Sequence, residues 1–363
     1  MARRDPSAPA LDRQMKAESV AVRGISLLSP AVQLRLAGGK PVRLDGQVLD
    51  PGTQLLLSVV EKRGGTPPPG KLPLAKERAL LTRQAIVGSA QPESVAEVRN
   101  FAIDGPAGKI KVRFYRSPEL GGPNPLLVFY HGGGFVLGDL DSHDSVCRAL
   151  SVHAGVDVLA VDYRLAPEHP FPAAPDDARA AFDWAVANAA DLGSDPTRVA
   201  VGGDSAGGNL AAVTAVDAAR SLAPPPVAQF LIYPALDFVE QSESMRLFSN
   251  GFFLTEEQME WFGIQYAGQI DDSADNRSNA RVSPIRVEDL SGVAPALIIT
   301  AGFDPLRDEG EAYGARLTAA GVDVVQRRFP DLVHGFMQMT GASVSARDAL
   351  LESAGALRSF LRR

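Results

Sequence analysis

Cysteine is almost absent from this sequence: among 363 residues only Cys147 occurs. An intrachain disulfide and a cysteine-based zinc or iron–sulfur site are therefore excluded, and the compartment need not be oxidising. Long apolar runs are also missing, since stretches such as residues 126–130 fall far below the ~20 residues that cross a bilayer. No apolar segment follows the two arginines near the start. We therefore expect no signal peptide, no stable membrane insertion and a cytoplasmic protein.

Clusters of positive charge are missing as well. The net charge is −7, and no basic run is longer than short pieces such as Arg327-Arg328, which argues against a nucleic-acid partner. No amphipathic helix with a basic face stands out, and this disfavours a lipase that works at a lipid surface. A hydrophobic fraction of 45% and a charged fraction of 22% are typical of a globular protein with a sizeable core.

Two regions of the chain differ in pattern. Up to about residue 95, apolar and polar residues recur with helical spacing, and a Gly/Pro-rich loop at 64–70 interrupts them. We predict an N-terminal helical arm or cap at 1–95 and a main domain at 96–363, with a helical cap insertion at about 238–289. Thr255, followed by two glutamates, is the expected N-cap of a helix in that insertion.

The main domain alternates short β-rich runs with helical ones, which predicts an α/β fold whose central sheet is mostly parallel and flanked by helices. The predicted strands are residues 98–103, 110–115, 126–130, 156–162, 199–202, 228–233, 296–300 and 322–329. The predicted helices are residues 142–154, 174–190, 207–220, 308–320 and 346–361.

A glycine-flanked serine follows one of these strands. The segment Gly203-Asp-Ser-Ala-Gly-Gly stands between the strand at 199–202 and a helix-like run, as a nucleophile elbow requires. The glycines permit a tight turn that presents Ser205 at the helix N-terminus, where negative charge is favoured. The motif alone also fits an ordinary glycine-rich turn, but it lacks the Lys-Ser/Thr ending of a phosphate loop. Ser205 is therefore the candidate nucleophile.

A second glycine-rich loop, His131-Gly-Gly-Gly-Phe, follows the strand at 126–130. Successive glycines let backbone amides turn inward, so two amides of this loop and that of Ala206 can surround a developing oxyanion. The alternative is a flexible surface loop, which the pairing with the serine motif disfavours. We expect His131 to order the loop rather than to act as a base.

A serine hydroxyl needs a base, and the order serine, acid, histidine expected for this fold leaves one candidate. Only His334 follows Ser205, and it stands in a loop after the last predicted strand. His143 and His153 lie on a predicted helix, and His169 lies in a proline-rich turn.

The orienting acid is expected between the serine and the histidine. Asp304 leaves the strand that begins at residue 296, whereas its competitor Asp308 is expected to lie in the first turn of the following helix. Asp204 diverges from its neighbour Ser205, so we expect it to bond to nearby backbone or polar groups.

Taken with Asp162-Tyr-Arg-Leu-Ala-Pro-Glu-His-Pro and Asp304-Pro-Leu-Arg-Asp-Glu, these motifs resemble the bacterial hormone-sensitive-lipase family (family IV) of α/β-hydrolase carboxylesterases, in its GDSAG subgroup. The similarity spans roughly residues 95–360. It implies a triad of Ser205, Asp304 and His334 and an oxyanion hole made by the amides of Gly132, Gly133 and Ala206. It also implies a two-step acyl transfer that needs no cofactor and no metal.

The resemblance further implies a helical cap over an acyl pocket and a homodimer formed through the last strand and the last helix. The segment Gly251-Phe-Phe-Leu-Thr resembles the pocket wall of the cap, although such an aromatic cluster also fits core packing. The candidate pocket residues are Phe135, Asp204, Tyr233, Phe252, Phe253 and Leu254.

The expected substrate is a small ester with a short-to-medium acyl chain. Amidases, lactonases and deacetylases use the same fold, and motifs alone do not separate them. A non-catalytic small-ligand receptor is the alternative of another class, and the intact His334 and Asp304 argue against it.

Overall fold

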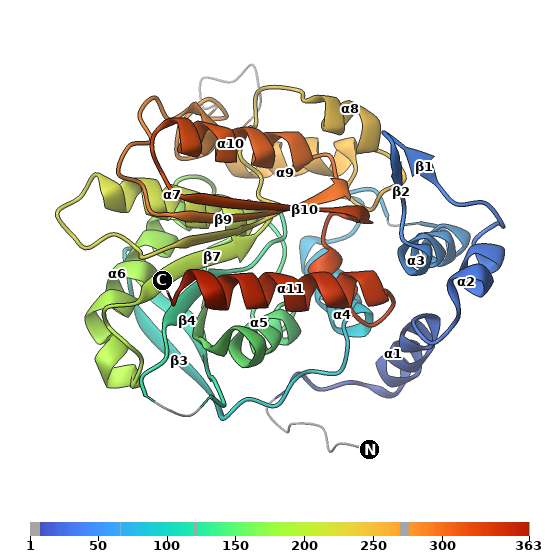
Figure 1. Ribbon diagram of the computed structural model, residues 1–363, viewed down its shortest axis with the longest axis horizontal. Helices are drawn as coiled ribbons and strands as arrows, with labels where there is room; N and C mark the ends of the chain where they lie inside the picture. The colour runs from blue at the N-terminus through green and yellow to red at the C-terminus, as the bar shows by residue number, and fades with distance from the viewer. Residues whose placement is uncertain (1–7, 66, 120–121, 269–275, 363) are drawn as a thin grey trace.

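In the computed structural model of the protein, the described residues are 8–65, 67–119, 122–268 and 276–362. Residues 269–275, which belong to the predicted insertion, lie outside them. The architecture is α/β, with a central sheet between two layers of helices, as Figure 1 shows.

Each predicted strand forms in the structure, and within the described residues the eight join into one sheet in the order β10-β9-β8-β7-β5-β6-β4-β3. Only the pairs β3–β4 and β4–β6 are antiparallel, so the expectation of a mostly parallel sheet is confirmed. The strands are β3 (Glu97–Gly105), β4 (Gly108–Arg116), β5 (Leu126–Tyr130), β6 (Asp157–Asp162), β7 (Val199–Asp204), β8 (Gln229–Ile232), β9 (Ala296–Phe303) and β10 (Val324–Val333). A separate small hairpin consists of β1 (Arg43–Leu44) and β2 (Gln47–Val48).

The predicted helices of the main domain form within a few residues of their expected bounds. The stretch predicted at 142–154 is shorter as an α-helix and ends in a π-helical turn at Ser151–Gly155. The helices of the main domain are α5 (Asp144–Leu150), α6 (Ala173–Leu192), α7 (Ala206–Ala219), α10 (Arg307–Ala319) and α11 (Val344–Phe360).

Both faces of the sheet are buried, because neighbouring residues of a strand point to opposite sides. In β5, Leu126, Val128 and Tyr130 pack with α6, α7 and α10, whereas Leu127 and Phe129 pack with α5 and α11 on the other face. A strand buried on both sides reads as an unbroken apolar run, which is why this segment was recognisable in the sequence.

The remaining helices belong to the N-terminal region and to the insertion. Thr255 caps α9 as predicted, since its hydroxyl accepts from Gln258 N and the side-chain Oε1 of Gln258 accepts in return from Thr255 N. These helices are α1 (Arg13–Ile25), α2 (Pro30–Leu36), α3 (Pro51–Lys62), α4 (Leu74–Gly88), α8 (Glu243–Phe248) and α9 (Glu256–Ala267). Short 3-10 turns occur at Pro284–Arg286 and Phe336–Gln338.

Candidate active site

The site lies where four parallel strands end. β5 leads into the loop that begins at His131, β7 into Ser205, β9 into Asp304 and β10 into His334. The carboxyl ends of parallel strands meet at one edge of a sheet, which is where α/β proteins bind their ligands. Residues that are distant in the sequence are thereby brought together.

Ser205 occupies a strained turn between β7 and α7. Its φ of 54° lies in the left-handed region, which is rare for a residue with a side chain. The neighbouring glycines are sterically required: a Cβ on Gly203 would lie 2.4 Å from Gly207 and Tyr130, and a Cβ on Gly207 would lie 1.9 Å from the carbonyl oxygen of Tyr130. The turn is therefore packed directly against the end of β5.

A hydrogen-bonded chain links the serine to a buried acid. Ser205 Oγ lies 3.0 Å from His334 Nε2, and His334 Nδ1 lies 2.9 Å from Asp304 Oδ2. The second oxygen of Asp304 accepts from the amide of Leu306 at 2.8 Å, and its side chain is fully buried. An ionised carboxylate only accepts, so it holds the proton on Nδ1 and leaves Nε2 to accept from the serine.

Asp308 lies elsewhere. It stands in the first turn of α10, where it accepts from the amide of Ser244 at 2.7 Å and pairs with Arg307. Asp304 alone of the two candidates contacts His334.

In the loop that follows β5, the Gly132 amide differs from the role expected of it. The amide of Gly132 donates to Asp204 Oδ1 at 2.9 Å, inside the protein, so it is not directed at a substrate. The prediction that Gly132 contributes an oxyanion donor is therefore corrected. Among the described residues, the amides of Gly133 and Gly134 have no hydrogen-bond partner, and both glycines line the cavity together with Ala206.

The side chain of Asp204 holds this loop in place through its hydrogen bond with Gly132. Burial by itself raises its pKa, but the neighbouring His143, at 3.1 Å, and the amide of Gly132 outweigh burial and lower the pKa of Asp204. The carboxylate is thus charged at neutral pH and binds the Gly132 amide through a charge-assisted hydrogen bond. Burial, and next the proximity of His143, lower the pKa of His131 to about 4, so that ring is neutral where it stacks on Tyr163. The expectation that His131 orders the loop agrees with these contacts.

We expect Asp204→Asn to lower kcat about tenfold while leaving KM nearly unchanged, because a neutral acceptor holds the Gly132 amide more weakly than a charged one. Because the pKa of Asp204 is lower in the folded protein than its usual value, the ionised carboxylate stabilises the fold above about pH 4. This stabilisation is lost as the pH falls through the lowered pKa. The melting temperature of Asp204→Asn should therefore lack the part of the decrease at acidic pH that protonation of Asp204 causes. Asp308→Asn, which removes a carboxylate outside the cavity, is the matched control for kcat. An unchanged kcat in Asp204→Asn would contradict an anchoring role.

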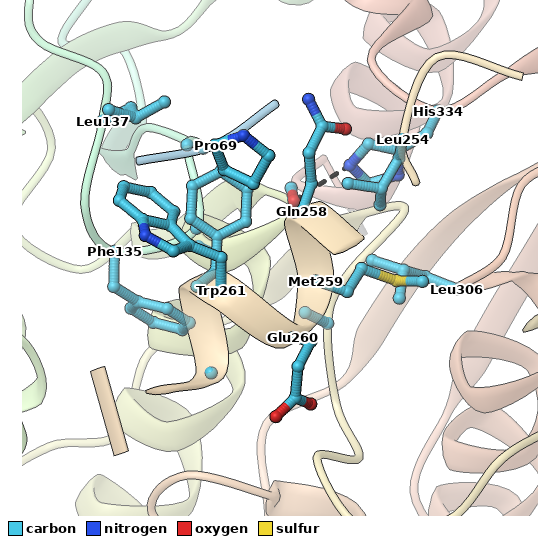
Figure 2. A pocket seen from close by; sticks show the side chains of 18 of the residues that line it. Pro69, Phe135, Leu137, Leu254, Gln258, Met259, Glu260, Trp261, Leu306 and His334 are labelled. Carbon is cyan, nitrogen blue, oxygen red and sulfur yellow. Dashed lines mark hydrogen bonds between the residues drawn. The ribbon is translucent and has the colours of Figure 1, made fainter. Parts of the chain in front are cut away.

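A cavity of about 910 Å³ lies over the serine. Four of the predicted pocket residues line it, namely Phe135, Asp204, Phe253 and Leu254. In Figure 2, Pro69, Phe135, Leu137 and Trp261 gather on one side of the cavity, and Leu254 and His334 lie on the other. The base and the nucleophile therefore face a cavity whose wall contains several aromatic side chains.

Two predicted pocket residues lie beneath the site instead. Phe252 packs in the core between Phe248 and Phe303, with ring centroids 5.6 and 5.3 Å away. The Tyr233 ring is buried at 4.8 Å from the His334 ring and supports the histidine from below. Neither lines the cavity, so both predictions are corrected: in the Phe-Phe pair, only Phe253 reaches the substrate side.

Several lining residues carried no signal in the sequence. The loop at 67–72 and the helix α4 supply Pro69, Leu80 and Leu81, and α9 supplies Met259 and Trp261. Their spacing is that of ordinary amphipathic helices, which does not reveal the surface that they cover. Within the described part of the chain, no three His, Cys, Asp or Glu side chains gather as metal ligands.

Glu309 was not predicted as a site residue either. Burial raises its pKa well above the usual value, and its Oε1 accepts from the amide of Leu236 at 2.6 Å beside the cavity. A neutral carboxylic acid at this position would add no charge to the cavity wall.

The chain is similar to proteins of known fold and activity. Residues 127–338, more than half of the chain, match a family model described as the alpha/beta hydrolase fold. The carboxylic ester hydrolase LipN of Mycobacterium tuberculosis is 48% identical over 345 residues, which cover 92% of this chain and 89% of that enzyme. An ethyl acetate hydrolase of Pseudomonas putida is 40% identical over 76% of this chain and 86% of its own length.

Solved structures show the same likeness. An ester hydrolase from the metagenome of Lake Arreo aligns with a TM-score of 0.82 and 41% identity, over 87% of this chain and 100% of that one. An esterase of Pyrobaculum calidifontis aligns with a TM-score of 0.77 and 38% identity, over 84% and 97% of the two chains. The chain therefore belongs to the α/β-hydrolase-fold family, among the serine carboxylic ester hydrolases that resemble hormone-sensitive lipase.

Proposed function

We propose that the protein hydrolyses small esters with short-to-medium acyl chains through an acyl-enzyme formed on Ser205. The observation that carries the proposal is the continuous hydrogen-bonded chain from Ser205 Oγ through His334 to the buried Asp304, beside a cavity of about 910 Å³. A serine so placed has a base within reach of its proton and an acid that orients the base.

In the first step Ser205 Oγ attacks the ester carbonyl carbon while its proton passes to His334 Nε2. The negative charge that develops on the carbonyl oxygen is bound by the amides of Gly133, Gly134 and Ala206, a set that replaces the one expected from the sequence. His334 then gives its proton to the departing alcohol. Water attacks the acyl-enzyme with the same base, which releases the acid and restores the serine.

Bulky rings limit the acyl chain. A Cβ on Gly134 would lie 2.3 Å from the Phe262 ring, so that ring rests directly on the glycine loop. A Cβ on Gly70 would lie 2.9 Å from Trp261 Nε1, so the N-terminal loop and α9 close against each other over the serine. We infer that the N-terminal region and the insertion together form the cap.

Hydrolysis of p-nitrophenyl esters with acyl chains of two to sixteen carbons tests this substrate class. We expect kcat/KM to be highest with the short and medium chains and to fall steeply beyond them, because a long chain has to pass the rings of Phe262 and Trp261. A maximum at the longest chains would contradict the proposal. Turnover of anilides in preference to esters would favour an amidase.

Trp261→Ala is expected to shift the preference toward longer acyl chains, by several-fold in the ratio of kcat/KM for eight-carbon and four-carbon esters, about 1 kcal/mol. The physical reason is that the change removes a large side chain that lines the cavity beside Pro69 and so widens the cavity there. The other tryptophan supplies the control: Trp184 packs on Phe101, outside the cavity, so Trp184→Ala should leave the ratio unchanged. An equal ratio in all three proteins would exclude Trp261 as a determinant of chain length.

Two expectations of the sequence stay predictions. The homodimer is supported by the position of β10 at an edge of the sheet, where another strand can pair with it, and light scattering that finds only a monomer would remove it. The cytoplasmic location also stays a prediction. In a separate observation, no helix among the described residues is long and apolar enough to cross a bilayer.

A further inference from the structure

Exposed apolar side chains concentrate on the N-terminal helices. Among the described residues, eleven large hydrophobic residues are exposed, and five of them lie within residues 20–36. These five are Val20 (71% exposed), Leu27 (86%), Leu28 (36%), Val32 (42%) and Leu36 (52%). Single exposed apolar residues are ordinary, but a contiguous group of them marks an interaction surface.

The group follows one face of α1 and continues through the turn into α2. On α1, Lys16 and Val20 are one turn apart and exposed, whereas Met15 and Ile25 are buried, and the exposed Leu27 and Leu28 follow in the turn after the helix. On α2, Val32 and Leu36 are one turn apart and both exposed. Each helix therefore packs on the protein with its inner side, and the apolar residues on its outer side are not part of the core.

The turn between the two helices is fixed. The buried Gln33 side chain donates to the carbonyl oxygen of Ile25 at 2.9 Å, which ties α2 to the end of α1. Figure 1 shows α1 and α2 at the outer edge of the molecule, away from the sheet. We call the outer side of residues 13–43 the arm face.

Positive charge surrounds these apolar residues. Residues 8–43 contain six basic and two acidic residues, a net charge of +4 in a chain whose net charge is −7. Both acids, Asp12 and Glu18, pair with Arg83 of α4 and are neutralised there. The exposed bases of the arm face form no ion pair with any described residue; they are Arg13, Lys16, Arg35, Lys40 and Arg43.

We propose that the arm face docks on an anionic lipid bilayer surface. Leucines and valines at the level of the headgroups remove apolar surface from water, and the surrounding lysines and arginines bind lipid phosphates, which is the composition of an interfacial helix. The positive charge favours a bilayer over a second copy of the chain as the partner of the arm face. A second copy would bring two positively charged faces together, whereas an anionic bilayer complements both the basic and the apolar residues.

Docking here also bears on the cavity. Arg83 of α4 holds α1 through Asp12 and Glu18, and the same helix lines the cavity with Leu80, Leu81 and Gln84. The helix α4 thus links the arm to the wall of the cavity. Attachment to a bilayer through the arm face does not depend on the ester chemistry at Ser205.

Sedimentation with lipid vesicles tests the proposal. The full-length protein is expected to pellet with vesicles of phosphatidylcholine and phosphatidylglycerol, to stay in solution with phosphatidylcholine alone, and to be released by salt, since screening weakens the charge contribution. The double change Leu27→Ser with Leu28→Ser, and separately Arg35→Glu, should each lower the bound-to-free ratio roughly tenfold or more.

Matched controls are available in the same chain. Leu222 and Leu351 are also exposed but lie far along the sequence from the arm, so Leu222→Ser with Leu351→Ser should bind as the unchanged protein does. All variants should keep full activity on a water-soluble ester, which shows that they fold and separates this test from that of the esterase proposal. Absence of binding to anionic vesicles would overturn the proposal. So would a dimer in light scattering that the Leu27/Leu28 change abolishes, because a second copy would then be the occupant.

Discussion

Replacing Ser205 by alanine is expected to lower kcat by roughly four to six orders of magnitude, because the acyl-enzyme cannot form without the hydroxyl that His334 activates. The fold should be retained, since the new residue keeps its Cβ in the strained turn and loses only an oxygen 3.0 Å from His334 Nε2. The measurement is kcat on a p-nitrophenyl ester, with thermal melting to verify folding.

Ser359→Ala provides the control for this change. That serine lies exposed on α11, where its hydroxyl donates to the carbonyl oxygen of Gly355, so full activity is expected. Substantial turnover by Ser205→Ala above the uncatalysed rate would mean that another group is the nucleophile.

A single methyl group on Gly133 is expected to lower kcat by about two to three orders of magnitude, the usual loss when an oxyanion donor is misplaced. Gly133 has a φ of 120°, which side chains rarely adopt, and a Cβ there would lie 2.2 Å from the carbonyl oxygen of Leu137. The loop has to move, and the amides of Gly133 and Gly134 move with it. KM should change little, since these amides bind the charged transition state more strongly than the neutral ester.

Gly355→Ala separates this effect from the general cost of altering a glycine. Gly355 lies in α11 with open space around its Cβ position, so alanine there should be neutral or slightly stabilising. Full activity of Gly133→Ala would contradict the assignment of this loop as the oxyanion site.

The sequence carried enough information to predict the sheet and the chain from Ser205 to Asp304. Strands such as β5 are buried on both faces and therefore unbroken in apolar character, which makes them visible without a structure. The order of the three functional groups along the chain left only His334 as base, and the position of Asp304 at the end of β9 distinguished it from Asp308.

The details of the oxyanion loop were beyond reach of the sequence. Gly132 and Asp204 are 72 residues apart, and their 2.9 Å contact arises only because β5 and β7 are neighbours in the sheet. In the sequence alone, the amides of three consecutive glycines cannot be told apart. Only the bond to Asp204 shows which of them is already engaged.

The cap and the arm illustrate a second limit. Phe252 and Phe253 are adjacent and equally aromatic, yet one packs on Phe303 and the other faces the cavity. Likewise, helical spacing in residues 13–36 shows apolar residues on more than one side of each helix. It does not say which of those sides the rest of the protein covers, so no interfacial helix was apparent before α1 and α2 were seen packed by their inner faces.

Covalent labelling with a fluorophosphonate, followed by mass spectrometry of the digested protein, tests the central claim most directly. We expect one adduct, on the peptide that contains Ser205, and none after His334→Ala, because the serine reacts only when the histidine accepts its proton. An unlabelled Ser205 in the unchanged protein, or an adduct on a different residue, would contradict it.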